Sequence, residues 1–251
     1  NVKAKKPELD LFLTARNSRL AAQSKHFPTM YFFLVITLIG VVGLLLLMRV
    51  MADFQPNERK VKADLQKMRD EIAQYGGELA PIDKQELDLF AVEQVHRVLK
   101  KRAVLTAKGV FTTIYHEPVA AYSYRRYVSS KLNALLYVRT AEREFVYRFK
   151  GKEVQIILNN QPLGTIKENG VLYSARDGSM LARLNAETAG LLPVVGKDRE
   201  LGSISARNLP AAAKPGLNSR AFEFVNDNLN DQEETLFLSF ALMELVKRSV
   251  G

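Results

Sequence analysis

The sequence predicts an α+β protein in which a transmembrane helix and stalk helices precede a mainly antiparallel, barrel-like β-domain with a buried C-terminal helix. Three observations support this prediction. Residues 27–48 form an uncharged apolar run, short alternating segments separated by hairpin turns fill residues 107–225, and the final segment is apolar on nearly every side. The expected parts are a basic tail (1–26), the membrane helix (27–49), a stalk helix (54–76) and a globular domain (81–251).

Composition bounds the class of protein. Hydrophobic residues make up 47% and charged residues 25% of the 251 positions, which is typical of a folded protein with a substantial core. The net charge is +9, but Lys and Arg are interleaved with Asp and Glu, so we expect no nucleic-acid partner. Without cysteine, the chain forms no disulfide, thiolate zinc site or iron–sulfur cluster, and the redox compartment is left open.

The membrane segment begins at Phe27 and ends at Met48. About 22 uncharged positions at 1.5 Å per residue give roughly 33 Å, which is enough to cross a hydrocarbon core of ~30 Å. Tyr31 and Phe33 lie near one end, where aromatic side chains favour the lipid headgroup region. The lipid bilayer is therefore the first expected partner.

A second partner of this segment is another helix, because Gly40 and Gly43 form a small-residue face. Two other interpretations stay open: the buried helix of a soluble protein, and a cleavable signal peptide, for which Val50 and Ala52 supply small residues. We favour a permanent anchor, because the run is longer than the roughly 7–15 apolar residues of a signal peptide.

Basic residues flank the apolar segment in nearly equal number on both sides, so the expected orientation depends on the lengths of the two flanking parts of the chain. Long domains cross a membrane largely regardless of charge, whereas short basic tails stay in the cytoplasm. We therefore expect a cytoplasmic N-terminus and an exported globular domain. The expected location is a bacterial inner membrane or an organelle membrane, crossed once.

Two amphipathic segments flank the membrane helix. In the tail, apolar residues recur at near-helical spacing around Arg16 and Arg19, which fits a short helix on lipid headgroups, a partner-binding helix or a mobile tail. Beyond the membrane, Leu65, Met68 and Ile72 belong to a heptad-like stripe. The stripe is too short for a free coiled coil, so we expect this stalk helix to contact a neighbouring subunit.

A further helix is expected over residues 83–102. Asp83 and Glu86 have the spacing of a capping box, and apolar residues follow at helical spacing from Leu87 to Val98. The cluster that begins at Lys100 is basic, as the C-terminal end of a helix dipole favours.

From residue 107 the hydrophobic period changes to two, and Asn159-Asn160, Asn169-Gly170 and Asp177-Gly178 are hairpin signals. An antiparallel meander is expected. Its strands are predicted over residues 110–115, 132–138, 144–149, 153–158, 163–166, 171–174, 180–184, 201–205 and 221–225.

The last predicted helix spans residues 231–248. Asn230 and Glu233 form its capping box, and its body is apolar on nearly every side. It should therefore be enclosed by protein. Glu244 interrupts the apolar stretch, which makes this helix too short to cross a membrane.

The hairpin series over 154–184, with its Leu163-Gly164-Thr165-Ile166 strand and Asp177-Gly178 turn, resembles the tubby-like barrel domain of tubby proteins, phospholipid scramblases and LURP-one proteins. The ending from Phe222-Glu223-Phe224 into the final helix is similar to that family as well. The resemblance covers about residues 107–250. It implies a closed antiparallel barrel around a central hydrophobic helix, and it transfers no site residue to this chain.

Motifs that carry chemistry are missing from the sequence. The three histidines lack ligand-like spacing, and no nucleophile elbow, Walker A loop or dinucleotide fingerprint occurs. We therefore expect no enzyme, metal or cofactor. One cluster, at Tyr124, Arg125, Arg126 and Tyr127, is either a contact surface for lipid or a partner, or a strand with tyrosines inward and arginines outward.

The expected function is that of a non-catalytic accessory or assembly subunit of a larger membrane complex. Its partners would be the bilayer and other subunits, contacted through the transmembrane and stalk helices. Two alternatives remain: a lipid-binding or lipid-moving protein, which the resemblance and the basic tail favour, and a membrane-tethered enzyme.

Overall fold

The computed structural model describes residues 26–54, 56–101, 104–127, 129, 131–205 and 220–250, with the backbone alone for 26–29, 49–54, 92–101 and 104. The basic tail, Arg16, Arg19 and the side chain of Phe27 therefore lie outside the described residues. The chain divides into two compact units, Asn1–Ala52 and Asp53–Gly251.

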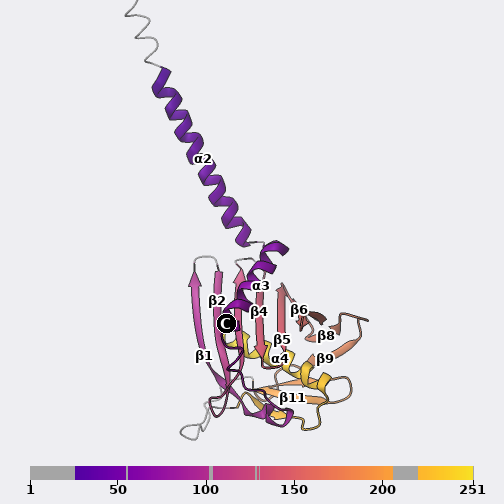
Figure 1. Ribbon diagram of the computed structural model, residues 1–251. Helices are drawn as coiled ribbons and strands as arrows, with labels where there is room; N and C mark the ends of the chain where they lie inside the picture. Colours follow the sequence, from indigo (N-terminus) through magenta and orange to yellow (C-terminus); the bar gives the residue numbers. More distant parts are fainter. Residues whose placement is uncertain are drawn as a thin grey trace, which may run out of the picture. The chain divides into compact units, whose positions relative to one another are not determined.

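The described residues of the first unit belong to the long helix α2 (His26–Phe54), whose last two residues are assigned to the second unit (Figure 1). Its stretch Met30–Met48 has a mean hydropathy of 2.7, and none of it is buried. Tyr31 and Phe33 are exposed over 66% and 63% of their surface, and Met48 over 59%. A helix of this length and composition fits a membrane span or a signal sequence.

The second unit is a nearly closed barrel of twelve strands, in which each strand pairs antiparallel with its sequence neighbours (Figure 1). The ends approach each other where the Ala221 N–H donates to the Phe90 carbonyl over 2.6 Å. The strands are β1 (Phe90–Lys101), β2 (Val104–Thr113), β3 (Pro118–Tyr127), β4 (Asn133–Thr140), β5 (Glu144–Lys150), β6 (Glu153–Leu158), β7 (Gln161–Ile166), β8 (Val171–Ser174), β9 (Met180–Leu184), β10 (Leu191–Val195), β11 (Glu200–Ser205) and β12 (Phe222–Val225).

Turn chemistry sets the hairpins, as the sequence predicts. Asn159 and Asn160 join β6 to β7 with φ of 47° and 64°, both in the left-handed region that the tight hairpin turn requires. Gly170 adopts φ of 75° between β7 and β8. These turns fix the register of the meander, because a slip of one residue would move each apolar face to the opposite side of the sheet.

Helix α4 (Asp231–Val250) is the centre of the main core. It begins with the expected capping box: the Glu233 N–H donates to the Asn230 side chain, and the Asn230 N–H donates to the Glu233 carboxylate, each over 2.9 Å. Phe237 and Phe240 are fully buried, and the Phe237 ring packs edge-to-face on Phe222 of β12 at 5.0 Å. Inward-facing residues of many strands surround the helix, so each of its apolar sides is satisfied.

Close packing explains the Leu-Gly pattern of β7 and β11, against β8 at the first glycine and against α4 at the second. A Cβ added at Gly202 of β11 would lie 2.7 Å from the Phe237 ring and 2.8 Å from the Phe224 carbonyl oxygen. At Gly164 of β7, an added Cβ would lie 2.2 Å from the Tyr173 carbonyl oxygen. Both glycines therefore provide space for a neighbouring element.

Helix α3 (Glu58–Ala73) packs on the outer face of β3 and β4. Met68 and Ile72 are buried there against Tyr127, Leu135 and neighbouring residues, which form a second apolar cluster. The sequence-predicted helix over 54–76 therefore exists and is shorter. Because its stripe covers the same chain's sheet, a role as a stalk stays a prediction.

The helix predicted over residues 83–102 is wrong. Asp83 does cap a helical segment, but this is the short 3₁₀ helix η1 (Lys84–Leu89), and the chain then enters β1. Residues of β1 pair with β2 from Phe90 to Lys101. Three β-branched valines at positions 92, 95 and 98 favour this strand, and the long pairing with β2 outweighs the helical spacing of the apolar residues.

The fold class is otherwise confirmed: a mainly antiparallel barrel followed by a C-terminal helix. Each predicted strand lies within or overlaps an observed one. Strands β3 and β10 were not predicted. Six consecutive residues of β3 are buried, because α4 lies on one side of it and α3 on the other, so the strand lacks the alternation of a half-exposed one.

The close approach at Gly202 gives a first test. We expect Gly202→Ala to lower the free energy of unfolding by about 1–3 kcal/mol, because the added methyl group overlaps the Phe237 ring. Chemical denaturation of the full chain in mild detergent, followed by circular dichroism, measures this change. Gly77→Ala is the matched control, since nothing lies within 4 Å of an added Cβ there. Equal effects of the two substitutions would contradict this packing.

Candidate functional site: a basic cleft at one end of the barrel

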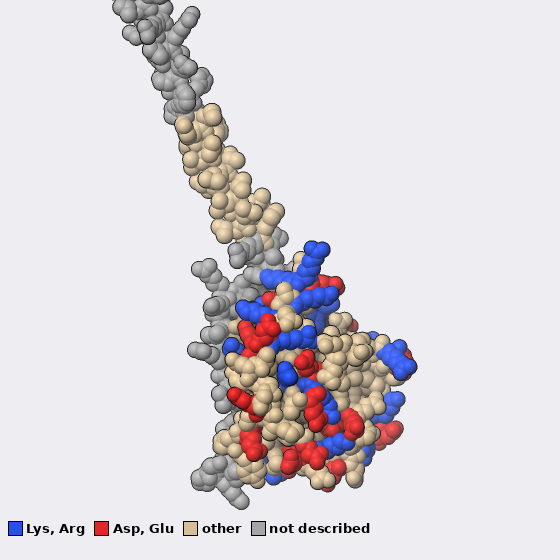
Figure 2. All heavy atoms as spheres, in the orientation of Figure 1, with Lys and Arg blue, Asp and Glu red and all other residues tan. Residues whose placement is uncertain are grey.

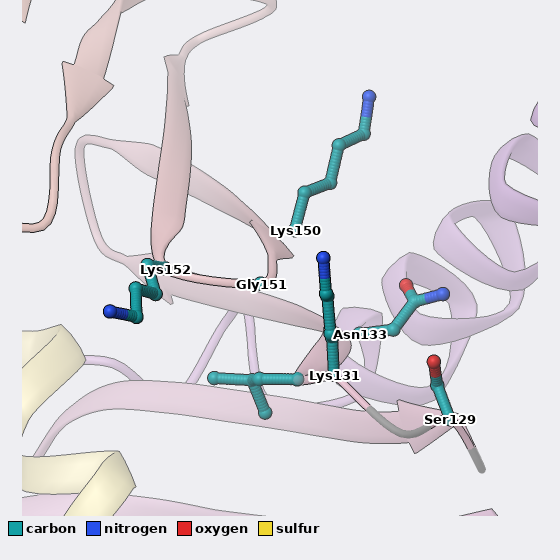
Figure 3. A pocket seen from close by; sticks show the side chains of 7 residues that line it. Ser129, Lys131, Asn133, Lys150, Gly151 and Lys152 are labelled. Atoms are coloured by element: carbon teal, nitrogen blue, oxygen red, sulfur yellow. The ribbon is translucent and has the colours of Figure 1, made fainter.

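The connections between strands alternate between the two ends of the barrel, as in any meander. We call the end with the β3–β4 and β5–β6 connections the lysine end. It carries an open cleft of about 740 Å³, the basic cleft (Figure 3). The residues that line it are Ser129, Lys131, Leu132, Asn133, Lys150, Gly151 and Lys152.

A backbone hydrogen bond joins the two loops that form the basic cleft. The Gly151 N–H donates to the Leu132 carbonyl over 2.6 Å, and Gly151 itself adopts φ of 64°. This turn conformation favours glycine, because a side chain would be strained there. The bond brings Lys131 and Lys150 together, and Figure 3 shows both side chains extending toward the same side while Lys152 points away.

The cleft carries an excess of positive charge. Lys131 and Lys150 are exposed, and neither forms an ion pair within the described part of the chain, whereas Lys152 pairs with Glu168. Half-buried Arg148 donates to the side chain of Asn133, which lines the cleft, and to the Ala134 carbonyl. Burial lowers the pKa of Arg148, but a guanidinium stays charged in proteins. The arrangement suits an anion with several acceptor oxygens.

Next to the cleft, a buried polar cluster fixes the first half of α3 to β3. Asp64 of α3 forms an ion pair with Arg125, and the Tyr127 hydroxyl donates to its carboxylate over 2.7 Å. Burial, followed by the hydrogen bond to Asp64, raises the pKa of Tyr127 well above its usual value. Tyr127 therefore stays a hydrogen-bond donor at any physiological pH.

The predicted contact cluster divides between the two faces of β3. Tyr124 points into the core and packs edge-to-face on Phe149 at 6.4 Å, whereas Tyr127 is buried on the opposite face beneath α3. Arg125 is half-buried by its pair with Asp64, and Arg126 is exposed at the end of the strand. Of the four residues, Arg126 alone is exposed.

The apolar stripe of α3, which was predicted to contact a partner, is covered by the sheet of the same chain. Met68 and Ile72 are buried and Leu65 is half-buried, all against the outer face of this chain's own sheet. An apolar stripe at helical spacing does not reveal which surface covers it. The interpretation of these three residues as contacts with a second protein is therefore corrected.

Sequence reasoning missed the residues that form the cleft. Lys150-Gly151 is a turn signal in the sequence, but nothing in one sequence indicates that this turn lies beside the β3–β4 loop. Asp64 was missed because it lies in a charged segment and resembles its solvated neighbours. An acidic residue within a heptad-like stripe, four positions before Met68, was the available signal.

The opposite end of the barrel, which we call the acidic end, has the reverse charge. A cleft of about 370 Å³ lies there between η1, the β4–β5 connection and the start of α4. Figure 2 shows Lys and Arg side chains crowded over α3 and Asp and Glu side chains gathered toward the other end. The charged residues of this cleft are Asp83, Lys84, Glu86, Glu142, Arg143, Asp231 and Glu234.

The acidic residues at this end are partly paired. Glu234 forms an ion pair with Arg143, and Asp231 forms one with Lys84. The hydrogen bond that Arg143 donates to the Glu234 carboxylate raises the pKa of Arg143. Within the described residues, no group of three or more His, Asp or Glu side chains is placed to hold a metal ion.

No protein-family model, curated protein or solved structure matches this chain. The barrel with its C-terminal helix is compatible with the resemblance to tubby-like domains, and membership of that family stays a prediction.

The buried pair between α3 and β3 gives a second test. We expect Asp64→Asn to lower the free energy of unfolding by about 3 kcal/mol, because the substitution leaves the Arg125 charge without its partner. Denaturation followed by circular dichroism measures the loss. Asp70→Asn, at an exposed carboxylate on the same helix, should stay within about 0.5 kcal/mol of the parent chain.

A double substitution separates the lost pair from other effects. Adding Arg125→Met to Asp64→Asn removes the stranded charge, so part of the lost stability should return. If Arg125→Met lowers the free energy of unfolding as much in the Asp64→Asn variant as in the parent chain, the two side chains are not coupled.

Proposed function

We propose that this chain is a non-catalytic, single-pass membrane protein that serves as an accessory or assembly subunit of a larger membrane complex. The observation that carries the proposal is the position of α4. Because this helix fills the barrel, the domain has its recognition surfaces on the outside and at its two ends. Surfaces of this kind suit docking.

The membrane part of the proposal rests on α2. Between Met30 and Met48, its large apolar side chains have about half or more of their surface exposed. An apolar surface of this extent requires a lipid environment or a protein partner. The stretch is also longer than the roughly 7–15 residues of a signal-peptide core, so we propose that it stays in the chain as an anchor.

We further propose that the barrel is exported and the N-terminus is cytoplasmic, since long domains cross membranes largely regardless of charge. A bacterial inner membrane or an organelle membrane fits this topology. Other subunits would contact the span at Gly40 and Gly43, where nothing in the described residues lies within 4 Å of an added Cβ.

Extraction in mild detergent tests the assembly role. A subunit should purify with the same partners in a constant ratio, and the ratio should persist after a second, orthogonal purification step. Gly40→Leu combined with Gly43→Leu should reduce that ratio at least fivefold, because leucine keeps the span apolar but blocks close helix contact. Quantitative mass spectrometry of the purified material measures the ratio.

Leu38→Phe with Leu45→Phe, which enlarges the opposite side of the same helix, is the matched control. It should leave the ratio within about twofold of the parent value. A chain that purifies alone, or equal losses for both pairs of substitutions, would contradict this role. Recovery of a shortened chain that lacks α2 would instead identify a signal sequence.

A second candidate function is lipid binding or lipid movement, as the tubby-like resemblance implies. The basic cleft is the observation that favours it, because the exposed ammonium groups of Lys131 and Lys150 suit phosphate oxygens. A chain that purifies without partner proteins and binds anionic lipid would favour this candidate over the role as a subunit.

A further inference from the structure

We propose that the lysine end of the barrel docks on the anionic surface of the membrane that holds α2, with Lys131 and Lys150 facing lipid phosphate groups. This inference rests on the proposed membrane span. It adds the face that the domain turns toward the bilayer and the class of lipid that it contacts.

The direction of α3 identifies the end at which the chain enters the barrel domain. Near its start, Asp64 contacts Arg125 and Tyr127, close to the end of β3. Near its finish, Arg69 contacts Asn160 in the β6–β7 turn and Glu144 at the start of β5. Helix α3 therefore runs from the lysine end to the opposite end.

Few residues separate the proposed span from the start of α3. Helix α3 begins at Glu58, ten residues after Met48, the last residue of the apolar stretch. Ten residues span at most about 35 Å. In chain order, the proposed span is therefore followed first by the start of α3, which lies at the lysine end of the barrel.

Charge at this end suits an anionic surface. Lys131 and Lys150 are exposed in the basic cleft, and Arg59 and Lys62 are exposed on the first turns of α3. Lys167 is exposed in the β7–β8 connection, which a pair between Lys152 and Glu168 joins to the cleft. A lysine near the surface of an anionic membrane strengthens binding by roughly fivefold.

The acidic end selects the same orientation by repulsion. Its cleft contains five carboxylates and two basic side chains, so an anionic surface would repel it. Attraction at the lysine end and repulsion at the acidic end both favour the orientation in which the lysine end faces the membrane. Because the proposed span already holds the domain beside the bilayer, docking is intramolecular and needs only a modest preference.

Energy transfer in lipid nanodiscs tests this orientation with the full chain. The protein has no cysteine, so Ser129→Cys places one fluorophore at the lysine end, and Tyr115→Cys places one at the exposed β2–β3 turn at the opposite end. Discs of phosphatidylcholine, with or without a third of phosphatidylglycerol, carry an acceptor on their headgroups. Co-elution with the discs verifies insertion of the chain.

We expect stronger transfer from position 129 in anionic discs than in neutral ones, and no such rise from position 115. High salt should remove the difference, because the Debye screening length falls to about 3 Å at 1 M. Lys131→Glu with Lys150→Glu should lower the ratio of docked to undocked domain by about 25-fold or more, because it removes two favourable charges and adds two repelled ones. The control pair Arg176→Glu and Lys197→Glu, exposed in turns at the opposite end, should change it less than about twofold.

The possible failures are distinguishable. A chain that co-elutes with the discs but shows equal transfer in anionic and neutral lipid overturns the docking and leaves the span in place. Equal effects of the two pairs of charge reversals, with unfolding curves that match the parent chain, overturn the assignment to the basic cleft. A chain that does not co-elute with the discs overturns the proposed span and the docking together.

Discussion

Enclosure of α4 is the constraint on which the rest of the barrel depends. A helix with apolar residues on every side needs a surrounding wall, and one continuous antiparallel meander supplies it. The wall must curve tightly where it meets bulky rings, which is why Gly202 faces Phe237 without a side chain of its own. The helix also separates the charges of the molecule: its acidic first turn lies at one end of the barrel, and Lys247 extends over the Phe149 ring beside the lysine end.

A second packing surface gives the domain its asymmetry. Helix α3 covers the outside of β3 and β4, so these strands are buried on both faces while later strands keep one exposed face. The ion pair of Asp64 with Arg125 fixes the register of α3 on the sheet, and a sheet clamped between two helices forms a stiff platform. The loops that extend beyond this platform, including the turn at Gly151, are held in fixed positions relative to the start of α3.

Local signals in the sequence predicted most of the meander and the terminal helix, because asparagine and glycine turns and the capping box at Asn230 act over a few residues. The prediction failed where tertiary contacts decide. Strand β3 lacks alternation because it is covered twice, and residues 90–101 adopt a strand because β2 offers a long partner. The same limit applies to the basic cleft. Lys131 and Lys150 are separated by two strands in the chain, and only the hairpin geometry brings them together.

The order of elements along the chain has a consequence for biosynthesis. The helix that fills the barrel follows all twelve strands, so these strands leave the ribosome before the segment that their inner faces must contact. During that interval the sheet has an apolar inner surface and an unfilled interior, a state that is prone to aggregation. Completion of the core therefore waits until α4 has also left the ribosome.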